Sequence, residues 1–217
     1  MTLAIFDLDN TLLSGDSDYL WGEFLCERNI VDSVRYREKN RQFFEAYESG
    51  TLDIMKFLEF SLEPLSRNDP QNLAKWHAEF MTRKIEPLIT DKARRLVEQH
   101  RDRGDTLLIV TATNSFVTRP IASRFGIDNL IATDPEIVAG RYTGRVSGEP
   151  SFREGKVTRL RQWLSNNDET LAGSTFYSDS HNDLPLLELV DSPVVVDPDD
   201  ILKAEAETRG WPIISLR

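Results

Sequence analysis

The sequence predicts a doubly wound α/β fold with a mainly parallel sheet, into which an all-helical domain is inserted. The chain opens on an apolar run, LAIFDLDNTL, that begins as a buried strand. Helical patterns alone follow up to residue 84, and from residue 88 strands alternate with helices. Such alternation implies right-handed crossovers and therefore parallel strands. The predicted domains are the core, residues 1–13 and 88–217, and the helical cap, residues 14–87.

Four helices are predicted in the cap because apolar residues recur there at spacings of three and four. They cover residues 18–29, 33–50, 52–65 and 69–84. Asp32 and Asp69 are expected to cap helices, and Gly50 and Pro64 to break them. The cap holds 11 of the 20 aromatic residues, which suggests a small bundle with a core of its own.

The remaining elements alternate as a Rossmann-like sheet requires. Strands are expected at residues 106–112, 130–133, 174–179, 193–197 and 212–216, with a hairpin at 136–146. Helices are expected at residues 92–104, 115–126, 152–167, 184–190 and 199–210. His77 and His100 are expected on helix surfaces.

Composition excludes several classes of function. The 217 residues carry a formal net charge of -10 without a basic cluster, so nucleic acid is an unsuitable partner. No apolar stretch approaches the ~18 residues that a membrane span needs. The lone Cys26 cannot form an internal disulfide. We expect a cytoplasmic protein without a membrane or nucleic-acid partner, as a monomer or a homodimer.

Polar side chains gather where the predicted strands end. Ligand sites of open parallel sheets lie beyond the carboxyl ends of the strands, so these residues are expected to meet. They are Asp7 and Asp9 after the first strand; Thr111, Ala112 and Asn114 after the second; Asp179, Asn182 and Asp183 after residue 178; and Lys156 near a helix start. Strand alternation is expected to place Asp7 and Asp9 on one side. Clustered carboxylates repel one another, which implies either strongly raised pKa values or a bound cation, and oxygen ligands suit Mg²⁺. Such a site is suited to phosphoryl transfer.

These motifs resemble those of the haloacid dehalogenase-like hydrolases. FDLDNTL resembles the family's DxDxT signature, VTAT its second motif, Lys156 its third, and YSDSHNDLP its GDxxND motif. They stand in the family's order between residues 7 and 183, and the helical insert matches the position of the family's first-type cap. Ser178 stands where glycine is common in the fourth motif, and His181 where a small residue is common.

The resemblance implies an aspartyl-phosphate mechanism. Asp7 would attack phosphorus, and Asp9 would protonate the leaving alcohol and then activate water. The Asp7 side chain, the Asp9 carbonyl and Asp179 would hold Mg²⁺, with Asp183 in support. Catalytic roles are thus expected for Asp7, Asp9, Thr111 and Lys156, and substrate contacts for Asp16, Thr111, Ala112, Asn114, Lys156 and Asn182.

The helical cap and the DLP after Asn182 look most like the phosphoserine phosphatase branch. There an acidic residue nine positions after the nucleophile binds the substrate ammonium, and Asp16 has that spacing. The branch's cap also carries a carboxylate-binding arginine, but Leu65 stands at that point here. We therefore expect a small phosphorylated metabolite without a carboxylate, L-histidinol phosphate first, with phosphoserine or a broader range of metabolites as alternatives.

Two other classes of protein use similar residues. A signalling receiver domain also combines acidic residues, a phospho-accepting aspartate, a threonine and a lysine at the end of a parallel sheet. A receiver domain lacks a large insert, and it lacks an acid two residues after the phosphorylated aspartate. This chain has both the insert and Asp9. A non-catalytic member of the fold is the other alternative, although every group that the chemistry needs is present.

Overall fold

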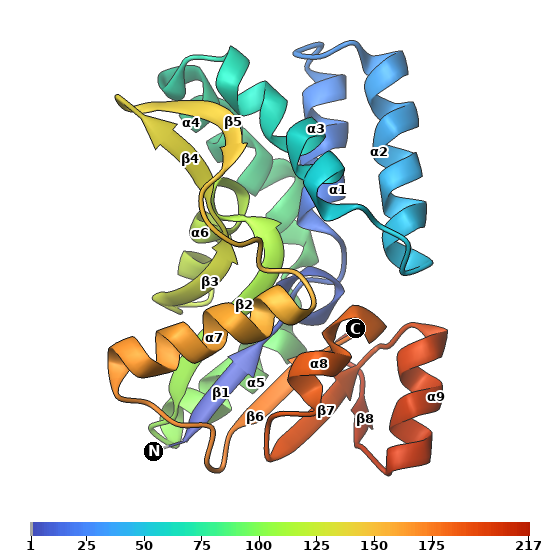
Figure 1. Ribbon diagram of the computed structural model, residues 1–217, viewed down its shortest axis with the longest axis vertical. Coiled ribbons are helices and arrows are strands. Elements are labelled where there is room, and N and C mark those ends of the chain that lie inside the picture. The colour runs from blue at the N-terminus through green and yellow to red at the C-terminus, as the bar shows by residue number, and fades with distance from the viewer. Residues whose placement is uncertain (1) are drawn as a thin grey trace.

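A computed structural model describes residues 2–217 and contains a six-stranded parallel sheet in the order β3-β2-β1-β6-β7-β8 (Figure 1). Its strands are β1 (Leu3–Phe6), β2 (Thr106–Asn114), β3 (Asn129–Thr133), β6 (Thr175–Ser178), β7 (Ser192–Val196) and β8 (Ile213–Ile214). The opening strand lies inside the sheet, between β2 and β6. The predicted Rossmann-like fold class is confirmed.

Helices cover both faces of the sheet. They are α5 (Asp91–Asp102), α6 (Ser115–Arg124), α7 (Glu154–Asn167), α8 (Leu184–Leu187) and α9 (Asp200–Arg209). Alternate residues of β1 point to opposite faces, so Ala4 and Phe6 pack with α5 and α6, while Leu3 and Ile5 pack with the other three helices. The sheet is therefore doubly wound.

The insert forms the four predicted helices, α1 (Ser17–Glu27), α2 (Ser33–Glu48), α3 (Ile54–Arg67) and α4 (Pro70–Phe80). A preceding aspartate caps each helix: Asp16, Asp32, Asp53 and Asp69 accept a hydrogen bond from a first-turn backbone N–H. Pro64 lies inside α3, so the prediction that it breaks the helix was wrong.

The insert's two connections to the core run side by side, because Leu13 and Ile89 form an antiparallel bridge. The hairpin of β4 (Pro135–Val138) and β5 (Arg141–Val146) is separate from the main sheet. Its residues Tyr142 and Val146 pack against Leu58 and Leu62 of α3. The hairpin thus contacts the insert, as Figure 1 shows. The division into core and cap domains stays a prediction.

Two local predictions were wrong. The first strand ends at Phe6, and Leu8–Leu12 form a helical turn in which Asn10 has a φ of 56°, so strand alternation does not place Asp7 and Asp9. His77 and His100 are buried rather than on helix surfaces: His77 contacts the Val117 carbonyl. Within residues 2–217 no helix is both long and apolar enough to cross a membrane.

Candidate active site

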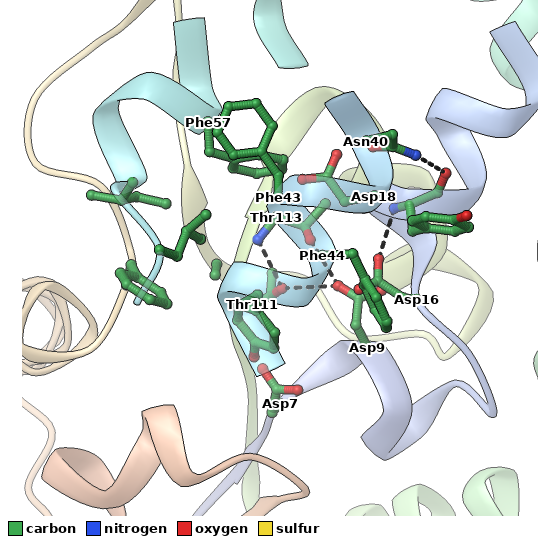
Figure 2. Close-up of a pocket in the computed structure, with 16 residues that line it drawn as sticks. Asp7, Asp9, Asp16, Asp18, Asn40, Phe43, Phe44, Phe57, Thr111 and Thr113 are labelled. Atoms are coloured by element: carbon green, nitrogen blue, oxygen red, sulfur yellow. Dashed lines mark hydrogen bonds between the residues drawn. The ribbon is translucent and has the colours of Figure 1, made fainter. Parts of the chain in front are cut away.

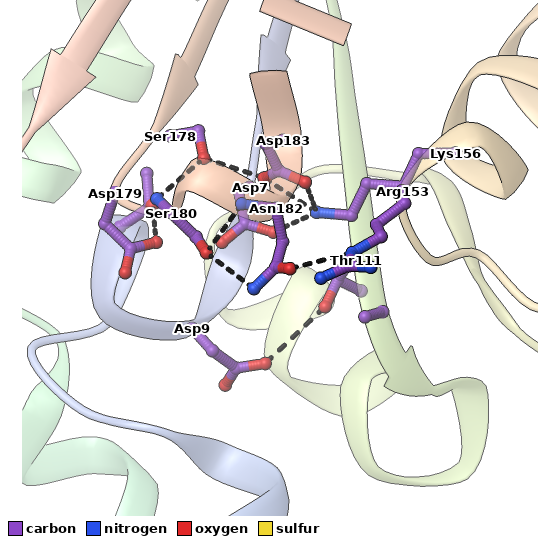
Figure 3. A network of polar contacts seen from close by, with 12 residues as sticks. Asp7, Asp9, Thr111, Arg153, Lys156, Ser178, Asp179, Ser180, Asn182 and Asp183 are labelled. Atoms are coloured by element: carbon purple, nitrogen blue, oxygen red, sulfur yellow. Dashed lines mark hydrogen bonds and ion pairs between the residues drawn. The ribbon is translucent and has the colours of Figure 1, made fainter. Parts of the chain in front are cut away.

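Four segments bring polar side chains together at the carboxyl edge of the sheet (Figure 3). Asp7 directly follows β1, and its backbone N–H donates to the Tyr177 carbonyl of β6 at 2.9 Å. Thr111 lies near the end of β2, and Asp179 follows β6. These three positions come from neighbouring strands, which is why residues far apart in the sequence share one site.

Lys156 joins two of the predicted carboxylates. Its Nζ donates to Asp7 Oδ1 at 2.7 Å and to Asp183 Oδ2 at 2.9 Å. The Lys156 side chain is only 3% exposed. Burial alone would lower the pKa of Lys156, but Asp183 and Asp7 raise it above its ordinary value, so the lysine stays charged. The preceding Gly155 lies against the Pro150 carbonyl, and a Cβ at this position would collide with it.

Asp7 itself is buried and carries a perturbed carboxyl group. Its pKa is raised to about 7, because burial and the nearby charges of Asp183 and Asp9 raise it by more than Lys156 lowers it. Only Oδ1 of Asp7 contacts Lys156. The ionised carboxylate therefore needs further positive charge at neutral pH.

Asp9 is held by the insert and by β2 together. Its Oδ1 accepts from the Ser17 backbone N–H at 2.6 Å, and its Oδ2 accepts from Thr113 Oγ1 at 2.8 Å and Thr111 Oγ1 at 3.5 Å. Burial raises the pKa of Asp9 although the hydrogen bonds from Ser17 and Thr113 act in the other direction. A raised pKa favours the protonated form of the carboxyl group, which is the form that a general acid needs.

Asp179 and Asp183 complete the acidic set. Asp179 Oδ1 accepts from Thr11 Oγ1 at 2.9 Å, and burial followed by the charge of Asp7 raises its pKa well above the ordinary range. Asp183 also accepts from Ser178 Oγ at 2.7 Å, so a hydroxyl occupies the position where the family motif commonly has glycine. In Figure 3, Asp7 is drawn between Asp179 and Lys156.

The donor chemistry fits Mg²⁺. Within the described chain no three acidic, histidine or cysteine side chains are arranged as a ready ligand cage. Mg²⁺ does not require one, because it keeps several waters and binds one or two carboxylates plus substrate oxygens. Asp7 and Asp179 are suitable ligands, because burial raises the pKa of both carboxyl groups and the charge of Asp7 raises the pKa of Asp179 further.

A cavity opens over Asp7 and Asp9 and extends under the insert (Figure 2). Its lining combines carboxylates with aromatic rings and contains no lysine, arginine or histidine among the described residues. The lining residues are Asp7, Asp9, Asp16, Asp18, Tyr19, Asn40, Phe43, Phe44, Tyr47, Leu52, Ile54, Phe57, Thr111, Ala112, Thr113 and Phe152. A bound molecule would contact the nucleophile candidate at one end and apolar side chains at the other.

The remaining predicted substrate contacts divide into two groups. Asp16 and Ala112 line the cavity, although one oxygen of Asp16 already accepts from the Tyr19 N–H at 2.8 Å. Asn114 and Asn182 do not line it. Asn114 caps α6, accepting from the Val117 N–H at 3.2 Å.

Asn182 instead links the core to the insert. Its Oδ1 accepts from Arg153 Nε at 2.9 Å, and its Nδ2 donates to the Tyr47 carbonyl at the end of α2 at 3.2 Å. Arg153 Nη2 also donates to the Gly50 carbonyl at 2.6 Å. Arg153 has a φ of 50°, a costly backbone conformation for a side chain of this size. The bonds to Asn182 and Gly50 hold the insert against the core beside Lys156.

Sequence reasoning missed several residues of the site. Thr113 is part of VTAT and could have been found as a second hydroxyl at a strand end. Asp18, Phe43, Phe44 and Phe57 carry no local signal, because only the packing of α1, α2 and α3 turns them toward one cavity.

Comparisons with known proteins agree with the motifs. The model of the haloacid dehalogenase-like hydrolase family matches residues 4–188. A Neisseria meningitidis serogroup C protein named histidinol-phosphatase is 48% identical over 219 residues, 99% of each chain. A Mycobacterium tuberculosis protein named phosphoserine phosphatase is 31% identical over 217 residues, 99% of this chain and 70% of that protein.

Solved structures share the fold. A protein of unknown function from Bordetella pertussis Tohama I superimposes with a TM-score of 0.94 over 100% of both chains, at 48% identity. A phospho-aspartyl intermediate analogue of phosphoserine phosphatase has a TM-score of 0.72 at 18% identity, covering 100% of this chain and 93% of that one. This membership favours an enzyme over the receiver and non-catalytic alternatives. The chain belongs to the haloacid dehalogenase-like hydrolases, and within that family it is a phosphatase.

Proposed function

We propose that this phosphatase hydrolyses a small amino-alcohol phosphate through an aspartyl-phosphate on Asp7. The observation that carries the proposal is the pairing of two differently placed carboxyl groups at one cavity. Asp7 is bonded to a buried cation, Lys156, whereas Asp9 is bonded to hydroxyl and amide donors and has a pKa that burial raises. Two carboxyl groups in different environments can act as nucleophile and as acid.

In the first step an Asp7 oxygen attacks phosphorus and the bond from phosphorus to the ester oxygen breaks. Asp9 gives its proton to the leaving oxygen, so the alcohol departs neutral. In the second step a water attacks the phosphorus of the aspartyl-phosphate while Asp9 takes up a water proton. The bond between phosphorus and Asp7 then breaks, and inorganic phosphate leaves.

The other predicted residues position the phosphoryl group. Lys156 and the Thr111 hydroxyl lie beside Asp7 and Asp9 and would bind its oxygens. Asp7, Asp179 and the Asp9 backbone carbonyl would hold Mg²⁺, with Asp183 fixed by Lys156 and Ser178 in support. When bound, the ion would supply positive charge that stabilises the transferring phosphoryl group.

L-Histidinol phosphate is the substrate that we propose first. The relative that is 48% identical is named histidinol-phosphatase. The acidic cavity lining without a basic residue also suits an amine and offers no partner to a substrate carboxylate. Phosphoserine is the second candidate, because a relative that is 31% identical is named phosphoserine phosphatase.

Steady-state phosphate release with Mg²⁺ tests this ranking across a panel of phosphomonoesters that includes both substrates. We expect kcat/KM for L-histidinol phosphate to exceed that for phosphoserine by at least about tenfold. The reverse preference would overturn the substrate proposal. Acid quenching during turnover, followed by peptide mass spectrometry, should place one phosphoryl group on Asp7; a phosphorylated residue elsewhere would contradict the mechanism.

A further inference from the structure

The cavity contains one carboxylate that neither the fold nor the proposed chemistry uses. Asp18 is the second residue of α1 and lines the same cavity as Asp7, Asp9 and Asp16. Figure 2 shows Asp18 near Asn40 on the insert side, with Asp7 at the other end of the cavity. Its place in the cavity makes it available to a substrate rather than to solvent alone.

Asp18 has no partner within residues 2–217: its side chain makes no hydrogen bond or ion pair there. This distinguishes it from Asp16, Asp32, Asp53 and Asp69, whose carboxylates cap helices. The helix dipole favours an acid in a first turn by only about 0.3–1 kcal/mol. Burial, and then the charges of Asp16 and Asp9, raise the pKa of Asp18 well above its ordinary range. The position is therefore unfavourable for an anion unless a positive group binds.

Aromatic rings form the adjoining wall. Phe43 and Phe44 of α2 and Phe57 of α3 line the cavity with Asp18, as Figure 2 shows. The faces of aromatic rings attract cations and stack on planar groups. A carboxylate beside such rings is suited to a flat ring that bears an N–H donor or a positive charge.

We propose that Asp18 is a specificity-determining residue that binds a ring N–H of the substrate, while Asp16 binds the amino group. The inference rests on the proposed function and deepens it. The substrate class is a phosphomonoester that carries an amine and, at a distance from the phosphate, a planar nitrogen heterocycle. Because both acids line the same cavity, they can bind two positive or donating groups of one molecule.

The test compares L-histidinol phosphate with L-leucinol phosphate, which keeps the amine and an apolar branch but has no ring N–H. The measured quantity is the ratio of the two kcat/KM values, in wild type and in Asp18→Asn. We expect the substitution to lower the ratio by at least about tenfold, because the negatively charged acceptor of the ring N–H is lost. Glu59→Gln, which removes a charge from the exposed side of α3, is the control and should leave the ratio unchanged.

A ratio that Asp18→Asn leaves unchanged, whether both rates fall together or neither falls, would overturn the inference. Should the variant fail to fold, inhibition of the wild type replaces it: L-histidinol should inhibit at least about tenfold more strongly than L-leucinol. Equal inhibition would also overturn the inference. Failure of the proposed function is recognised separately, as absent phosphatase activity or a preference for phosphoserine in the wild type.

Discussion

The core half and the insert half of the site are built differently. On the core side, Lys156 connects Asp7 to Asp183, and Asp183 is bonded in turn to Ser178. On the insert side, Asp18 has no partner in the described chain, and its neighbours Phe43, Phe44 and Phe57 offer only ring faces. The core half is a hydrogen-bonded network, whereas the insert half is a cavity wall with an unpartnered carboxylate.

This difference separates chemistry from recognition. A network whose members are bonded to one another keeps the nucleophile in place before a substrate arrives. An unpartnered carboxylate among aromatic rings gains a partner only when a ligand binds. Its contribution to binding affinity therefore depends on the ligand. We expect substitutions in the core half to change the rate for every substrate, and substitutions in the insert half to change which substrate is preferred.

The most disruptive change to the core half is Asp7→Asn. Removing the nucleophile should lower phosphate release by at least about 1,000-fold for every substrate, because the covalent step is lost. The fold should persist, since the amide is nearly isosteric and Lys156 keeps Asp183 as an anionic partner. Measured phosphate release tests the loss of activity, and thermal unfolding tests whether the fold persists. Activity within a few fold of wild type would remove Asp7 as nucleophile.

Lys156→Met should disturb both stability and activity. The variant leaves Asp7 and Asp183 without their shared cation, and breaking such a buried pair costs about 3–5 kcal/mol. Denaturant unfolding measures the loss. Lys203→Met, which removes an exposed lysine of α9, is the matched control and should change the free energy of unfolding little. Equal stability of the two variants would contradict the network described for the core half.

Stabilisation by Mg²⁺ should grow as pH rises from 5 to 8. The pKa of Asp7 is raised to about 7 by burial, so the metal-free folded protein holds a proton there that the unfolded chain has already lost above pH 4. The folded state then binds more protons, and this group's contribution to stability falls as pH rises toward 7. Mg²⁺ bound at Asp7 would replace this proton.

The difference in melting temperature with and without Mg²⁺ measures this linkage and cancels the contributions of buried histidines. Each proton displaced changes the stabilisation by about 1.4 kcal/mol per pH unit. Asp7→Asn should reduce the pH dependence. A pH-independent difference in melting temperature would show that the ion does not bind at the perturbed carboxylates.

The smallest effect is expected where the two halves touch. Arg153→Met removes the hydrogen bonds that Arg153 donates to Asn182 and to the Gly50 carbonyl after α2. Losing them should weaken the contact between insert and core by about 1–2 kcal/mol. We expect KM to rise severalfold and kcat to change less. Arg161→Met, at an exposed position of α7, the helix that begins directly after Arg153, serves as control. A fall in kcat with KM unchanged would place Arg153 in the chemistry instead.

The core half was largely predictable from the sequence. Asp7 and Asp179 follow strands and Thr111 lies near the end of β2, and parallel strands carry such positions to one edge regardless of their separation in the chain. The argument for Asp9 was wrong in its cause: a helical turn, not strand alternation, directs it to Ser17 and Thr113. A turn containing a residue with positive φ is set by contacts that local periodicity does not contain.

The insert half was predictable only as four helices. Helical periodicity marks which residues are apolar, but it does not say whether a ring packs in the bundle or faces a ligand. Phe60 packs within the core, whereas Phe57 also lines the cavity. His77 and His100 were misplaced for the same reason, because each is buried by partners 40 and 77 residues away in the chain.

The sequence by itself determined the doubly wound sheet, the four capped helices of the insert and the set of residues at the strand ends, because periodicity, capping and strand order are local or topological properties. Only the tertiary structure decided that Lys156 bridges Asp7 and Asp183, that Arg153 and Asn182 join the core to the insert, and that Asp18 has no partner. These depend on distances between segments far apart in the chain, which packing of the whole molecule sets.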